Sequence, residues 1–185
     1  MRRLLPLFGW VLALPVAAVV WAAGGGFVVD QAATRLVDEV YHLEAHISLQ
    51  LTPAVREALD SGVPLTLELD IEAVHPREWL WSETVASLNQ RYRLRYHALS
   101  GQYLVTNLNS NVQSSYGTLR AALRAIGTVE DLPILDRRLL KVGKHYDGRL
   151  RVRLDLGALP SPLRVWAQVS SDWRLSSDWY TWSLQ

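Results

Sequence analysis

The 185-residue chain contains no cysteine, so its fold cannot depend on disulfides and must be held together by its core. The same absence excludes a lipid attached to a cysteine behind a leader. An excess of charge is lacking too: without Arg2 and Arg3, 17 basic residues stand against 18 acidic ones. This near balance gives no reason to expect nucleic acid as a partner.

The chain does contain one long uncharged run, close to its N-terminus. Residues 4–23 carry no charge, follow Arg2 and Arg3, and lead into Gly24-Gly25-Gly26. A basic start, an apolar stretch and a small-residue exit are typical of a secretory signal. About 20 apolar residues are also enough to span a bilayer as a helix. We therefore predict a signal peptide or signal anchor over 1–26 and a single exported β-rich domain over 27–185.

The leader also predicts where the protein lies. If it is cleaved, the domain is released into the periplasm. If it is retained, residues 4–23 form an N-terminal hydrophobic helix in the inner membrane, with Arg2 and Arg3 on the cytoplasmic side. The domain lies outside the cytoplasm in both cases.

Apolar and polar residues alternate with a period of two through most of the domain, which is typical of half-buried strands. This pattern covers residues 41–51, 65–72, 86–98, 150–156 and 180–184. Ser100-Gly101 indicates a hairpin turn between 97–99 and 102–108, and a further strand is expected over 112–116. Strands with one buried face and one solvent-exposed face are typical of antiparallel sheets.

Two short helices are expected to interrupt the strands. The first begins at Thr52-Pro53, an N-cap followed by proline, and ends at Gly62. The second covers 118–126, where apolar residues share one face, and ends at Gly127. About eight strands with two helical insertions predict a mainly β fold, namely an antiparallel, immunoglobulin-like β-sandwich. A flattened α+β sheet is the alternative.

Three separated segments resemble a known family. They are HPREWLWSETVASLNQRYRLRYHALSGQYLVTNL (75–108), DLPILDRRLL (131–140) and SSDWYTW (176–182). In these segments the chain resembles the bacterial domain of unknown function 4390 family. The resemblance implies a bacterial envelope protein that starts with an export signal, and it implies no reaction, ligand or catalytic residue.

Charged residues form stripes on three of the expected strands. Basic stripes comprise Arg91, Arg93 and Arg95 on one strand and Arg149, Arg151 and Arg153 on another, and the acidic stripe comprises Glu68, Asp70 and Glu72. The arginines could bind an anionic lipid or polysaccharide. Cross-strand ion pairing with the acidic stripe is the structural alternative, because opposite charges on neighbouring strands stabilise a sheet. Two arginine strands side by side without acidic neighbours would favour anion binding.

Tryptophan is abundant in the expected domain, where Trp79, Trp81, Trp166, Trp173, Trp179 and Trp182 occur. Tryptophan suits both a core and a partner or sugar surface, because it combines a large apolar area with one N–H donor. In SSDWRLSSDW (170–179) the repeated Ser-Ser-Asp indicates two turns rather than a binding repeat. The candidate ligand or partner surface comprises Trp79, Trp81, Trp173 and Trp179 with Arg91, Arg93 and Arg95.

No residue set predicts a catalytic or metal site. His42 and His46 share one face of an expected strand about 13 Å apart, too far for one metal ion. Glu68, Asp70 and Glu72 have a spacing that a glycosidase could use, but every acidic strand face shares it. We therefore expect no enzyme, no metal and no cofactor. The leading hypothesis is an envelope protein-interaction module at or near the inner membrane; the alternatives are a binder of an anionic lipid or glycan, and a hydrolase of envelope polymers.

Overall fold

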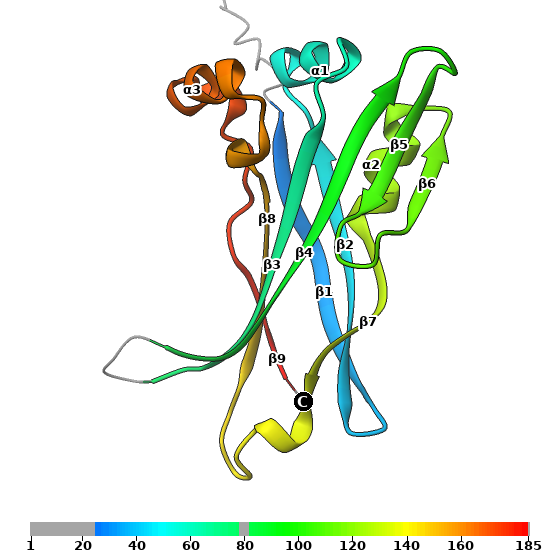
Figure 1. Ribbon diagram of the computed structural model, residues 1–185. Coiled ribbons are helices and arrows are strands. Elements are labelled where there is room, and N and C mark those ends of the chain that lie inside the picture. The colour runs from blue at the N-terminus through cyan, green and yellow to red at the C-terminus, as the bar shows by residue number, and fades with distance from the viewer. Residues whose placement is uncertain (1–24, 78–81, 185) are drawn as a thin grey trace, which may run out of the picture.

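The computed structural model describes residues 25–77 and 82–184 (Figure 1). The predicted N-terminal helix, Trp79 and Trp81 lie outside the described residues. Within these residues, nine strands form two antiparallel sheets, so the prediction of a mainly β fold is confirmed. The smaller sheet has the order β1-β2-β7 and the larger one the order β6-β5-β4-β3-β8-β9.

The strands have the following bounds. They are β1 (Gly26–Val37), β2 (Val40–Gln50), β3 (Leu65–His75), β4 (Glu83–His97), β5 (Gln102–Asn107), β6 (Gln113–Tyr116), β7 (Thr128–Asp136), β8 (Asp147–Leu154) and β9 (Tyr180–Ser183). Strands β3 to β6 follow one another as consecutive neighbours in their sheet. Immunoglobulin-type sandwiches use Greek-key connections instead, so this finer part of the prediction is not confirmed.

Both predicted helices are present, and each begins at a threonine N-cap. Thr52 Oγ1 accepts a hydrogen bond from the Val55 N–H at the start of α1 (Pro53–Asp60). Thr118 Oγ1 does the same for the Ala121 N–H of α2 (Leu119–Gly127). Short 3-10 turns lie at η1 (Arg137–Leu139), η2 (Leu156–Ala158) and η3 (Ser171–Trp173).

A third helix, α3 (Ser161–Val169), was not predicted from the sequence. It has no side-chain cap, because Pro160 stands at its N-cap, and its β-branched Val165 and Val169 lower helix propensity. No helix among residues 25–77 and 82–184 is long and apolar enough to cross a membrane.

The main core lies between the facing sides of the two sheets. Leu43 of β2 and Leu67 of β3 are fully buried there, as are Leu94 of β4 and Leu150 of β8. A second, smaller core cluster contains Tyr41, Ala73, Leu135, Tyr146 and Leu184. In β2 and β8 the predicted alternation therefore separates a face in the core from a more exposed face, whereas β3 is largely buried on both faces.

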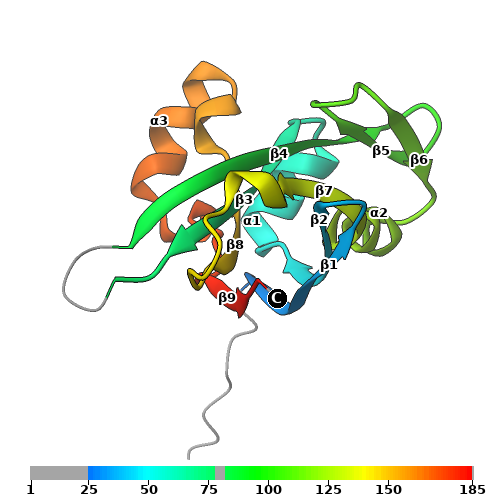
Figure 2. The ribbon, with the colours of Figure 1, turned by 90° about the horizontal axis from the view of Figure 1, so that it is seen from below.

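The helices occupy distinct places around the sheets. Helices α1 and α3 lie at one end of the molecule, and the C-terminus lies toward the other end (Figure 1). Strand β1 starts at the α1 end, because Gly26 pairs with Gln50 just before α1. Helix α2 packs beside β2, β5 and β6 (Figure 2). This arrangement creates the cleft described below.

Candidate functional site

The acidic strand β3 lies between the two arginine strands, β4 and β8. On one side Glu68 is opposite Arg91, and on the other Glu68 is opposite Arg153. Asp70 and Glu72 lie opposite Arg151 and Arg149 of β8 in the same register. The predicted cross-strand ion pairing is therefore confirmed, and the two arginine strands do not adjoin each other.

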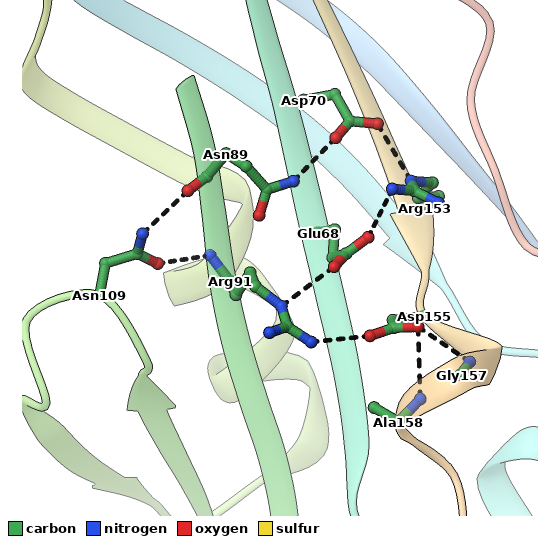
Figure 3. Close-up of polar contacts among 9 residues, drawn as sticks. All are labelled: Glu68, Asp70, Asn89, Arg91, Asn109, Arg153, Asp155, Gly157 and Ala158. Carbon is green, nitrogen blue, oxygen red and sulfur yellow. Dashed lines mark hydrogen bonds and ion pairs between the residues drawn. The ribbon is translucent and has the colours of Figure 1, made fainter. Parts of the chain in front are cut away.

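These charged residues form cross-strand ion pairs along the outer face of the large sheet. We name this set the ion-pair ladder, comprising Glu68, Asp70, Glu72, Arg91, Arg149, Arg151, Arg153 and Asp155. Arg91 Nε lies 3.0 Å from Glu68 Oε1, and Arg91 Nη2 lies 2.8 Å from Asp155 Oδ2 (Figure 3). Arg153 joins Glu68 to Asp70, with distances of 2.7 Å and 3.0 Å. Asp155 in turn accepts the N–H groups of Gly157 and Ala158, which fixes η2.

Asp70 shows how strongly the ladder favours ionised carboxylates. Burial by itself raises the pKa of Asp70, but hydrogen bonds from Arg151 and Asn89 and the charge of Arg153 outweigh burial. The pKa of Asp70 therefore lies below its ordinary value. The ladder's charges are matched within the protein, so it offers little free charge to an external anion.

Arg93 and Arg95 differ from Arg91. All three lie on the outer face of β4, but only Arg91 takes part in the ladder. Arg93 and Arg95 are exposed, and no described residue forms an ion pair with either. Of the predicted arginine surface, these two side chains remain open to a ligand.

The two tryptophans of the C-terminal repeat have different surroundings. Trp173 is 2% exposed and belongs to the core, so it offers no surface to a partner. Trp179 is half-buried beneath the guanidinium groups of Arg149 and Arg151, whose Cζ atoms lie 4.7 and 4.5 Å from its ring centre. These cation–π contacts hold the Trp179 ring against two arginines of the ladder. The candidate surface does not form around this repeat, since Trp173 lies inside and Trp179 is covered by arginines.

The histidines of the HLEAH segment have no metal-like arrangement. His42 Nδ1 lies 2.9 Å from Asp131 Oδ1, whereas His46 is exposed on the same strand. Among residues 25–77 and 82–184, no three His, Asp or Glu side chains gather in a way that could hold a metal ion.

Sequence reasoning missed a cleft of about 950 Å³ beside α2. Its walls come from β2, α1, β5 and the start of α2. The lining residues are Ile47, Ser48, Leu49, Gln50, Leu51, Arg56, Tyr103, Gly117, Thr118, Leu119, Arg120, Leu123 and Arg124. The lining combines apolar side chains with three arginines and contains neither aspartate nor glutamate.

One wall of the cleft is an unpaired strand edge. Strand β7 pairs with β2 only between Val40 and His46, whereas β1 continues to Gln50. A methyl group on Gly127 would lie 2.2 Å from the Ile47 carbonyl oxygen, so this oxygen points toward α2. Because alternate residues of a strand direct their polar groups to the same side, the N–H and C=O of Leu49 also face this edge. No described strand pairs with β2 there.

The charge of the cleft comes mainly from α2. Arg120 and Arg124 are exposed, lie one helical turn apart, and have no ion pair with any described residue. Arg56 also lines the cleft, but it forms an ion pair, since its Nε lies 3.7 Å from Asp60 Oδ2. The Tyr103 hydroxyl donates a hydrogen bond to Asp60 Oδ1 at 3.0 Å. Burial and this hydrogen bond raise the pKa of Tyr103, so its hydroxyl stays protonated at neutral pH.

The arginines of this cleft could have been found from the sequence. The spacing of Arg120 and Arg124 on the polar face of a predicted amphipathic helix identifies a positive stripe. The unpaired edge of β2 has no local signal, because the residues that line it read as an ordinary strand.

One of the comparisons with known proteins agrees with the sequence resemblance. Neither the curated proteins nor the solved structures contain a match to this chain. One family model matches residues 25–183, almost all of the described domain. The chain therefore belongs to the family described as Domain of unknown function (DUF4390).

Proposed function

We propose that this protein is a non-catalytic interaction module of the cell envelope, exported by its leader and held at or near the inner membrane. Its binding site is the cleft, and its ligand is an extended acidic segment of another envelope protein. The observation that supports this most is the unpaired edge of β2 next to Arg120 and Arg124.

Backbone geometry supports an extended peptide. An unpaired strand edge presents N–H and C=O groups at the spacing of a further strand, and peptides bind such edges by adding to the sheet. The cleft follows the end of β2 and the next residue, from Ile47 to Leu51, which corresponds to about 13 Å of extended chain. A peptide here would pair with the polar groups of Leu49 and pack against Leu119 and Leu123.

Charge supports an acidic peptide. Three arginines and no acidic residue line the cleft, so a basic segment would meet unfavourable charge at Arg120 and Arg124. Arginine binds carboxylates through two parallel hydrogen bonds, which adds orientation to attraction. Side chains at alternate positions of an added strand point the same way, so acidic residues two apart could reach Arg120 and Arg124 together.

A second candidate is an anionic lipid or glycan. The same arginines would hold its charged group, and Leu51, Leu119 and Leu123 would contact an acyl chain. A lipid would not use the polar groups of the β2 edge. The peptide therefore accounts for more of the cleft than the lipid does.

Binding measurements on the full chain in detergent separate the two ligands. The probes are a fluorescent Glu-Val-Glu-Val-Glu peptide, a Lys-Val-Lys-Val-Lys control and dodecyl phosphate. We expect the acidic peptide to bind, and we expect R120A with R124A to weaken it at least about tenfold, or 1.4 kcal/mol. R93A with R95A is the matched control, because it removes two exposed arginines elsewhere. Binding of dodecyl phosphate alone would favour the lipid, and unchanged binding in R120A with R124A would contradict the site.

Photo-crosslinking in cells tests the proposed partner. The crosslinker replaces Gln50 in the cleft or, as a control, Arg93 on the outer face of β4; both positions are exposed. We expect a crosslinked protein at position 50 that disappears in R120E with R124E. Crosslinks only at position 93 would move the function to the sheet face. Crosslinks at neither position would contradict an interaction module.

A further inference from the structure

We propose that α3 is a second membrane contact of this protein, lying on the lipid surface beside the predicted anchor, residues 4–23. Val165, Trp166 and Val169 would enter the boundary between lipid headgroups and acyl chains. This inference concerns how the domain sits on the bilayer and is independent of what the cleft binds.

The outer face of α3 is unusually apolar for an exposed helix. Val165 is 71% exposed, Trp166 54% and Val169 75%. The opposite side faces the protein, where Ala167 is fully buried and Leu163 packs against the core. Scattered exposed apolar residues are common, but three on one nine-residue helix form a patch, and such patches mark contacts with a partner or a membrane.

Trp166 contacts the protein on one side of its ring. Its ring meets that of the buried Trp173 edge-on, with 6.4 Å between the ring centroids. Tryptophan is enriched at membrane interfaces, because its ring is apolar and its N–H can hydrogen bond in the headgroup region. A tryptophan that already packs against a buried ring loses less side-chain entropy on entering lipid than a fully exposed one would.

The start of the domain lies close to α3. Gly25 contacts the backbone of Leu51 and Thr52, and the Thr52 hydroxyl donates a hydrogen bond of 2.8 Å to the Asp172 carbonyl oxygen. Asp172 belongs to η3, which follows α3 and packs against it. The start of β1, α1 and α3 thus share one end of the molecule (Figure 1).

The choice of lipid as the occupant rests on the proposed membrane anchor and on its short connection to the domain. Three peptide units separate Ala23 from Gly26, and a fully extended chain of this length spans at most about 11 Å. If residues 4–23 cross the bilayer, this end of the domain is held against the membrane surface. An apolar patch at the tethered end then meets lipid at a high effective concentration, although α3 alone would bind vesicles weakly.

The absence of cysteine makes the test direct, because one introduced cysteine gives one labelled site. The full chain is reconstituted into phosphatidylethanolamine and phosphatidylglycerol vesicles, with the environment-sensitive fluorophore NBD at V165C. The matched control is V142C, because Val142 is fully exposed in the loop between η1 and β8. Doxyl-labelled lipid then quenches any fluorophore that lies in the bilayer.

We expect several-fold stronger quenching at position 165 than at position 142, and we expect V169D to reduce quenching at position 165. Circular dichroism of V169D checks that the fold is retained. Equal quenching at positions 165 and 142 would overturn the proposal. A blue-shifted fluorophore at position 165 without lipid quenching would overturn it too, because α3 would then be covered by protein.

Discussion

The ion-pair ladder and the cleft are both rich in arginine, but their arginines have different neighbours. In the ladder, Arg91 and Arg153 lie against carboxylates of β3 at hydrogen-bonding distance. In the cleft, Arg120 and Arg124 have no ion pair with any described residue. The number of arginines is therefore a poor guide to a binding site. Whether arginines are available to a ligand depends on the acidic residues around them.

The difference has a physical basis. A carboxylate between two guanidinium groups neutralises them and leaves little potential for an external anion. Helical arginines beside an acid-free cleft keep their potential and their hydrogen-bond donors for a ligand. We therefore expect the ladder to contribute to stability, and we propose that the cleft contributes to binding. The following predictions test this division, and the largest expected effect comes first.

The largest loss of stability is expected where α2 meets β2. In Gly127→Ala the new methyl group would lie 2.2 Å from the Ile47 carbonyl oxygen, so α2 must move away from the wall of the cleft. We expect about 3 kcal/mol of destabilisation, measured by urea unfolding. Gly117→Ala is the control, because no atom lies within 4 Å of its Cβ position. Equal stability of the two variants would show that the contact is not constrained.

A smaller loss is expected at the centre of the ladder. Glu68→Ala leaves Arg91 and Arg153 without a shared, largely buried carboxylate, and we expect a loss of about 2 kcal/mol. Glu130→Ala removes an exposed glutamate of β7 and is expected to change stability by less than about 0.5 kcal/mol. Similar values for both variants would mean that the ladder does not stabilise the sheet.

The pH dependence of the free energy of unfolding tests the contribution of Asp70. Its pKa is lowered in the folded state, so its ionised form stabilises the fold above the unfolded pKa of about 3.9. This contribution is lost as the pH falls through the lower folded pKa. We expect Asp70→Asn to be less stable than the native protein at neutral pH by about 1 kcal/mol, with the difference shrinking below pH of about 4. A difference that is constant with pH would contradict this role.

The smallest effect on stability is expected in the cleft. R120A with R124A should change the urea midpoint little, by less than about 0.5 kcal/mol, because neither side chain is buried or paired with a described residue. The same pair of substitutions should abolish most of the acidic-peptide binding. A stability loss as large as that of Glu68→Ala would place these arginines in the structure rather than in a site.

Sequence patterns predicted the regular parts of the fold well. Alternation placed β2, β3, β4 and β8 within about three residues of their observed bounds, the Thr52 cap placed α1, and the apolar face of residues 118–126 placed α2. The β1–β2 hairpin was missed, because its turn is Asp38-Glu39, both with positive φ (48° and 66°), rather than a glycine or asparagine pair. Helix α3 was missed because its valines and prolines do not indicate a helix.

For this protein, the sequence by itself determined the strands with one apolar and one polar face, the core without disulfides, the apolar run of residues 4–23 and the opposite charges that pair as the ladder. These features depend on local periodicity and on charge, which neighbouring residues already display. Only the tertiary structure decided that Trp173 is buried and that Arg91 is paired with carboxylates while Arg93 is exposed. It also decided that β2 extends beyond the last residue that pairs with β7, beside α2. Those features depend on which distant segments meet, and no local pattern contains that information.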